Sequence, residues 1–97
     1  MSDPMIALTQ PIKAHDETVE SLTLRRPTGK DVRELGYPYK ISADESVSLQ
    51  ADVIARYIER LAAIPRSSVD QMDPVDLNAA AWAVAGFFLG SAASPKN

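Results

Sequence analysis

The stretch 22–31, which reads L-T-L-R-R-P-T-G-K-D, constrains the fold more than any other part of the chain. Its two leucines alternate with polar side chains, which is the period-two pattern of a strand with one buried face. Pro27 has no N–H to donate to a sheet and therefore predicts the end of that strand. Thr28, three residues before Asp31, is typical of a helix N-cap with an acid in the first turn. The stretch predicts a joint at which a strand passes directly into a helix, built by Leu24, Pro27, Thr28 and Asp31.

A β-hairpin is predicted N-terminal to this joint. The apolar face of its first strand is formed by Ile6, Leu8 and Ile12. Pro11 indicates an edge position or a bulge in this strand. Val19 begins the return strand but is out of phase with the leucines that follow, and a bulge near Glu20-Ser21 would bring the two phases into agreement. A hairpin of this size is unstable alone, so we expect helices on one of its faces.

The next two predicted helices are a short one and a long one. The short helix covers 28–35, with Gly36 in the left-handed position after its end. The segment Ser42-Ala43-Asp44-Glu45 has the S-x-x-E form of a capping box and predicts the start of a long helix that runs to about Ala63. An apolar stripe at i, i+3 and i+4 spacings would consist of Leu49, Val53, Ile54, Tyr57, Ile58 and Leu61.

The C-terminal third predicts a short turn and a last helix. A further capping-box form, Ser68-Val69-Asp70-Gln71, predicts the turn. The strongest helix start follows, with Asp73 as N-cap, a proline in the first position and Asp76 in the first turn. We expect this helix to run to about Leu89, with Gly90 beyond its end.

These elements predict an α+β fold, in which an N-terminal β-hairpin precedes a helical region of two longer and one or two short helices. The expected organisation is a disordered N-terminus (1–4), a single α+β domain (5–90) and a flexible C-terminal tail (91–97). The 97-residue length fits one domain with one small core.

Composition narrows the class of protein. Hydrophobic residues make up 45% and charged residues 24%, as in ordinary globular domains. The net charge of −3 argues against a general nucleic-acid binder, and the absence of cysteine removes disulfides and thiolate chemistry. The N-terminus shows no secretory signal pattern. The apolar part of the charge-free run near the C-terminus, 79–89, is too short to span a membrane.

No residue pattern predicts catalysis, a metal site or a cofactor. His15, beside Asp16 and Glu17, lacks the ligand spacing of a zinc centre, and a solvated hairpin loop explains it better. Gly29-Lys30 lacks the remaining residues of a phosphate-binding loop. Helix capping explains Asp73 and Asp76 better than a metal site does, and no serine or threonine has a base partner other than the histidine. We therefore expect a protein that is not an enzyme.

The only basic cluster consists of Arg25, Arg26, Lys30 and Arg33. It lacks interleaved aromatic residues and is diluted by Asp31 and Glu34, so a charged rim around the joint explains it better than a nucleic-acid site.

The last predicted helix shows no polar face after Asn78. A helix that is apolar all round must be buried on all sides, and a chain of this length offers little material to surround it. Two interpretations are compatible: a central core helix, and a face that docks onto a second copy or a client. The candidate contact residues are Trp82, Val84, Phe87, Phe88 and Leu89.

The order of the elements resembles the small tail assembly chaperones of Mu-like long-tailed bacteriophages. The resemblance rests on the first strand, the L-T-L-R-x-P-T-G-x-D joint with Val32–Gly36, the helical pattern around Tyr57, the Asp73–Leu77 helix start and the Phe87-Phe88-Leu89 ending, over roughly 5–90. It implies a phage or prophage chaperone in the host bacterial cytoplasm that acts in virion assembly through protein-protein interaction. Such a chaperone keeps the tape-measure protein soluble, helps recruit tail tube subunits and is absent from the mature virion.

The resemblance further implies partners and leaves alternatives. Expected partners are the tape-measure protein, the tail tube protein and a frameshifted longer form of the chain itself, with a homo-oligomer as a further option and no nucleic acid or membrane. The main alternative is a small DNA-binding regulator or antitoxin-like protein that dimerises through its last helix, and its DNA binding would fall steeply with salt. A minor structural part of the virion is a third option.

Overall fold

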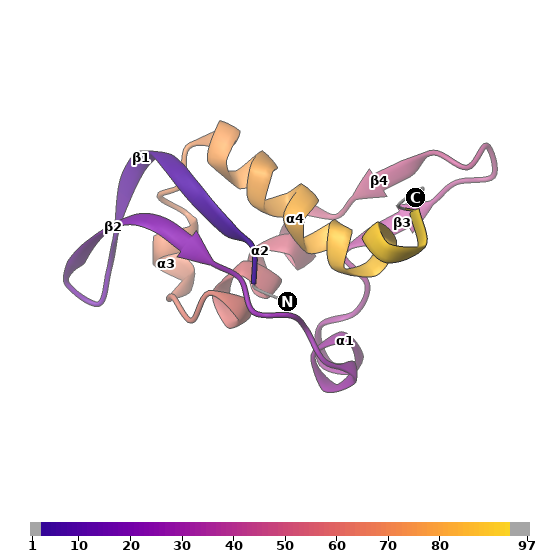
Figure 1. The fold of residues 1–97 in the computed structure, drawn as a ribbon, viewed down its shortest axis with the longest axis horizontal. Helices are drawn as coiled ribbons and strands as arrows, with labels where there is room; N and C mark the ends of the chain where they lie inside the picture. The colour runs from indigo at the N-terminus through magenta and orange to yellow at the C-terminus, as the bar shows by residue number, and fades with distance from the viewer. Residues whose placement is uncertain (1–2, 94–97) are drawn as a thin grey trace.

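The computed structural model describes residues 3–93 and confirms the predicted α+β class (Figure 1). Residues 1–2 and 94–97, which fall in the predicted terminal segments, lie outside this description. An antiparallel hairpin of β1 (Met5–Ala14) and β2 (Glu17–Thr23) opens the chain. The later elements are α1 (Gly29–Leu35), β3 (Tyr39–Ile41), β4 (Val47–Leu49), α2 (Ala51–Leu61), α3 (Arg66–Val69) and α4 (Pro74–Ala93).

The first hairpin forms as predicted, with a turn at His15 and Asp16. Both residues have positive φ, as the central positions of a two-residue hairpin turn require. The register slips between Ala7 and Ile12, at the level where the phases of the two strands disagreed. The extra residues of this irregularity lie on β1, around Pro11, so the bulge that the proline indicated is confirmed. The extra residue that was expected on β2 near Glu20-Ser21 is not there.

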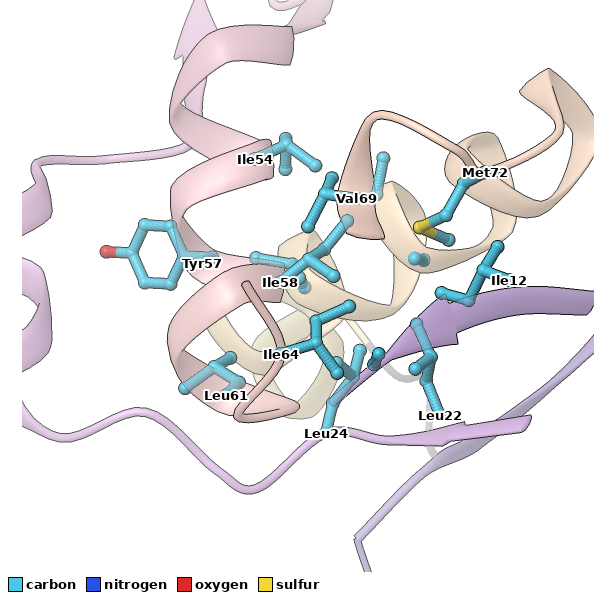
Figure 2. Packing of buried hydrophobic residues seen from close by; sticks show 14 residues of the cluster. Ile12, Leu22, Leu24, Ile54, Tyr57, Ile58, Leu61, Ile64, Val69 and Met72 are labelled. Atoms are coloured by element: carbon cyan, nitrogen blue, oxygen red, sulfur yellow. The ribbon is translucent and has the colours of Figure 1, made fainter. Parts of the chain in front are cut away.

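The core lies between the even-numbered face of this hairpin and the helices (Figure 2). From the hairpin side come Ile12, Leu22 and Leu24, all at most 3% exposed. From α2 come Ile54, Tyr57, Ile58 and Leu61, four members of the predicted apolar stripe. The helices therefore bury the one face that an isolated hairpin would leave open.

The long helix predicted from Ser42 is wrong in its first part. The chain forms a second antiparallel hairpin, β3–β4, and α2 begins only at Ala51, so Leu49 lies on a strand. The backbone carbonyl of Ser42, not its hydroxyl, accepts from the Glu45 N–H. Asp44 instead accepts hydrogen bonds from the N–H and hydroxyl of Ser46, which is the local bonding of a turn.

Two further boundaries differ from the prediction. Helix α3 begins at Arg66 after Pro65, and the hydroxyl of Ser68 donates to the Lys13 carbonyl at 2.5 Å instead of capping a helix. Helix α4 continues through Gly90 to Ala93, so the expected end at Gly90 is wrong. In Figure 1, α4 crosses the molecule from the β1 side to the side of β3 and β4. No helix within residues 3–93 combines the length and the apolarity that crossing a membrane would need.

Candidate interaction surface

Helix α4 is held at its start by two aspartates with different roles. Asp73 caps the helix as predicted, because its Oδ1 accepts from the Val75 N–H at 2.9 Å. Asp76 does more than complement the first turn. It is 2% exposed and accepts hydrogen bonds from the Thr9 N–H at 2.9 and 3.0 Å, the Thr9 hydroxyl at 3.1 Å and the Gln10 N–H at 3.3 Å.

The bonds to Asp76 fix α4 against the first hairpin. Thr9 and Gln10 lie in the part of β1 that has no partner residue in β2, so this carboxylate accepts from backbone groups that the hairpin leaves over. The N–H of Thr9 contributes most to holding the pKa of Asp76 below its ordinary value. This contact joins residues 67 positions apart in the sequence. Because it holds one side of α4 against β1, it sets which face of α4 meets the core and which face meets solvent.

The solvent side of α4 is almost entirely apolar. We call it the outer face, and it consists of Val75, Asn78, Ala79, Trp82 and Gly86, all exposed. Trp82 is 51% exposed and Val75 is 64% exposed, which is unusual for side chains of this kind. The opposite side carries the buried Ala80, Ala81, Val84 and Ala85, whose small side chains allow close packing. An apolar helix therefore presents an uncharged strip to solvent.

The structure distributes the predicted contact residues over different environments. Trp82 lies at the centre of the outer face, whereas Val84 is fully buried. Phe87, Phe88 and Leu89 are partly buried. The sequence pattern did not indicate Val75 as a contact residue, because Val75 stands in the first turn of α4, before the charge-free run begins.

Phe88 belongs to an aromatic cluster that joins α4 to α2, to β3 and to the loop before β3. Its ring meets Tyr37, Tyr39 and Tyr57 edge to face at centroid separations of 5.8–6.0 Å. Such contacts contribute about 0.5–1.5 kcal/mol each beyond burial. Phe87 lies 6.0 Å from the Arg26 guanidinium. Both phenylalanines therefore help to hold α4 in place.

A shallow apolar groove of about 240 Å³ adjoins the outer face. Asn78 belongs to both surfaces. The remaining lining residues are Leu49, Ala51, Ile54, Pro74, Leu77 and Ala81. The apolar surface therefore extends from α4 toward the start of α2.

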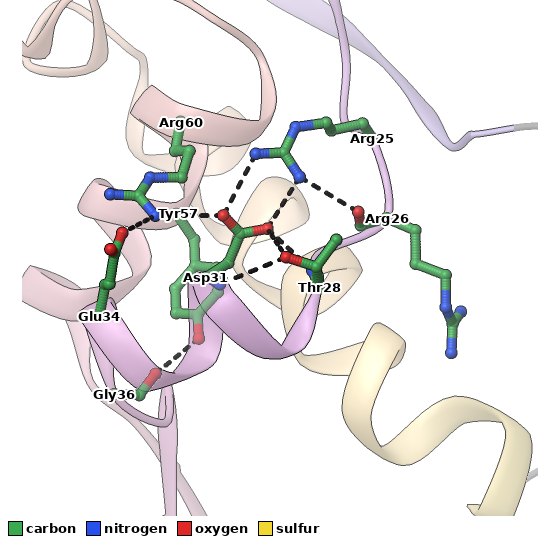
Figure 3. A network of polar contacts seen from close by, with 8 residues as sticks. All are labelled: Arg25, Arg26, Thr28, Asp31, Glu34, Gly36, Tyr57 and Arg60. Carbon is green, nitrogen blue, oxygen red and sulfur yellow. Dashed lines mark hydrogen bonds and ion pairs between the residues drawn. The ribbon is translucent and has the colours of Figure 1, made fainter.

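The predicted joint forms as expected and carries a buried charge (Figure 3). Thr28 caps α1, and a reciprocal capping box joins it to Asp31, whose Oδ2 accepts from the Thr28 N–H at 2.8 Å. Leu24 is fully buried and Pro27 is half-buried between strand and helix. The local signals in the sequence were sufficient because each cap bond spans only three residues.

Two arginines neutralise Asp31, which is 4% exposed. Arg25 binds it through both terminal nitrogens at 2.8 and 3.2 Å, and Arg60 of α2 binds it at 3.1 Å. The Arg25 hydrogen bonds, followed by the Thr28 N–H, lower the pKa of Asp31 far below its ordinary value. Arg60 also binds Glu34 at 2.8 Å. Arg25, a member of the basic cluster, thus serves the joint.

A second groove, of about 560 Å³, has a lining that mixes charged and apolar residues of α2 and of the segment that follows it. Its three arginines are paired: Arg56 with Asp52, Arg60 with Asp31 and Glu34, and Arg66 with Glu59. His15 lines it too, with Nε2 3.2 Å from the Ala63 carbonyl oxygen. Within residues 3–93, no three histidine or acidic side chains gather in a way that could hold a metal ion.

Comparison with models of known protein families gives a match. A family model described as "Phage tail assembly chaperone proteins, E, or 41 or 14" matches residues 5–89, which is nearly the whole described chain. No curated protein and no solved structure matches.

Proposed function

The chain belongs to the phage tail assembly chaperone family, and we propose that it binds the tape-measure protein, keeps it soluble and helps recruit tail tube subunits around it. By this proposal it acts in the cytoplasm of the host bacterium and is absent from the mature virion. The observation that carries the proposal is the outer face of α4, an exposed apolar strip centred on Trp82.

The outer face suits a long apolar client. Exposed apolar surface of this kind marks protein-protein contacts in soluble proteins. Burying the exposed half of an indole of roughly 250 Å² would contribute about 3 kcal/mol at about 25 cal/mol per Å². Trp82 therefore has the character of an interface hot spot, with Val75 about two helical turns before it on the same face.

For this function the chaperone needs only to cover the apolar stripe of a client helix, because a client with that stripe exposed would aggregate. A helix laid along an apolar strip buries side chains at i, i+3, i+4 and i+7, which is a common mode of peptide recognition. The groove beside Asn78 widens the strip on the α2 side. Many copies bound along one client would leave it soluble until tube subunits replace them.

The test is co-expression with the tape-measure protein of the same phage, with soluble client and co-purification as readouts. We expect wild type to keep the client soluble, and the double variant Val75→Ala, Trp82→Ala to lose this effect. The matched control is Ile41→Ala, Val47→Ala, which removes two exposed apolar side chains from the β3–β4 hairpin. Circular dichroism would establish that both variants are folded.

Three results would contradict parts of the proposal. An insoluble client with wild type would exclude tape-measure binding. Equal loss in the control variant would exclude the outer face as the contact surface. Detection of the chain in purified particles by mass spectrometry would exclude its absence from the mature virion.

A further inference from the structure

The outer face of α4 has a spacing that reads the same in both directions. Its apolar members Val75, Ala79, Trp82 and Gly86 are separated by four, three and four residues. Alternating steps of four and three are the spacing of a coiled-coil seam. Because the order 4-3-4 is a palindrome, a second α4 running antiparallel presents the same spacing to the first.

The sizes of these side chains alternate as well. Antiparallel alignment places Val75 of one copy opposite Gly86 of the other and Trp82 opposite Ala79, so each large side chain meets a small one. A Cβ added to Gly86 would meet no atom within 4 Å, so this position is a notch open to solvent. A parallel alignment would instead put Trp82 against its own copy and leave gaps at the small residues.

We propose that the chain forms a two-fold symmetric dimer through antiparallel packing of the outer faces of two α4 helices, with Trp82 of each copy seated over Ala79 of the other. An isologous contact requires a surface complementary to itself, and this strip has that property in both spacing and size. No charge lies on the strip to oppose the approach of an identical copy.

The contact area makes this dimer weak and reversible. From Val75 to Gly86 the helix advances about 17 Å, and a helix is about 10 Å wide. This footprint is far smaller than the roughly 800 Å² per partner that standard stable interfaces bury. The dimer should therefore form at high concentration and exchange readily.

A reversible dimer would cover the face that the client needs. This consequence rests on the proposed function: the free chaperone would shield Trp82 in a dimer, and the client would bind by displacing the second copy. Self-association and client binding would then exclude each other, whereas the dimer itself can be tested without any client.

The test is a size-swap series measured by sedimentation equilibrium up to about 1 mM, near the weak limit for specific contacts. We expect wild type to dimerise with rising concentration. Trp82→Ala creates a gap and Ala79→Trp creates a clash, so each should weaken the dimer about tenfold or more. The double variant Ala79→Trp, Trp82→Ala restores large opposite small and should recover most of the loss. Ile41→Ala, exposed but distant in the chain from α4, is the control and should dimerise as wild type does.

A second pair tests the same alignment without the tryptophan. Gly86→Val should weaken the dimer, and adding Val75→Ala should restore part of it, so a folding failure in the first series does not end the test. Wild type that stays monomeric throughout, or double variants no better than the single ones, would overturn the dimer. If the dimer fails but the client still binds, only this inference falls; if the dimer forms but the client is never bound, the proposed function falls alone.

Discussion

Truncation of Trp82 should destabilise the fold less than truncation of Tyr57, although tryptophan has the larger ring. Tyr57 is fully buried, contacts Phe88 edge to face and donates its hydroxyl to the Gly36 carbonyl at 2.6 Å. Trp82 is half exposed on the outer face. If α4 is oriented as described, truncating Tyr57 should destabilise the fold severely and truncating Trp82 should not.

The magnitudes follow from burial and hydrogen bonding. Tyr57→Phe keeps the ring and loses one hydrogen bond, so the free energy of unfolding should fall by about 1 kcal/mol. Tyr57→Ala should cost about 3–5 kcal/mol, as for other large aromatic truncations in cores. Trp82→Ala loses about half of such a burial and gains helix propensity, which leaves a cost of about 1 kcal/mol.

Urea unfolding followed by far-ultraviolet circular dichroism measures these values without relying on the single tryptophan. In wild type, the tryptophan fluorescence should be readily quenched by a soluble quencher at low protein concentration. A Trp82→Ala cost equal to that of Tyr57→Ala would contradict this prediction, since Trp82 would then be a core residue and the outer face would not exist.

The remaining predictions concern the two buried aspartates and one glycine. The pKa of Asp31 is lowered in the fold, chiefly by Arg25, so the contribution of Asp31 to stability is complete above the unfolded pKa of about 4 and is lost as the pH falls toward the folded pKa. Asp31→Asn should therefore weaken the pH dependence of the urea midpoint between neutral pH and about pH 3. An unchanged pH dependence in this variant would exclude the ion pairs of Asp31 as its source. The hydrogen bonds from Thr9 likewise lower the pKa of Asp76. Asp76→Asn should therefore reduce the free energy of unfolding at neutral pH and speed the hydrogen exchange of the Thr9 and Gln10 amides. Unchanged exchange at these two amides would contradict the anchoring role of Asp76. Gly86→Ala should raise the unfolding free energy by up to about 1 kcal/mol, because the helix gains propensity and the new methyl group meets no atom; a destabilised variant would show that the outer face is occupied within the monomer.

The sequence predicted well wherever the deciding contacts are local. The cap of α1 by Thr28 and Asp31 and the cap of α4 by Asp73 join residues that are two or three positions apart. These contacts form within one turn of helix, so residue type and spacing are sufficient to specify them.

The S-x-x-E segment at Ser42 shows where local reasoning failed. The same residues can cap a helix or close a turn, and the local preference between them is small. The turn forms here because β3 pairs with β4 and because the Gln50 N–H donates a hydrogen bond to the Pro38 carbonyl. These bonds span up to twelve residues and leave no signal in a window of helical length.

By itself, the sequence determined the hairpin, the strand-to-helix joint, the start of the last helix and the fact that this helix has more apolar surface than one small domain can bury. It could not determine which side of α4 is outside, because a helix without a polar face carries no amphipathic signal. The tertiary structure decides this through Asp76, whose carboxylate binds the backbone of β1 at Thr9 and Gln10 and so turns Val84 inward and Trp82 outward. A buried carboxylate is unfavourable unless it accepts hydrogen bonds, and in this fold the unpaired backbone N–H groups of the irregular strand β1 donate them.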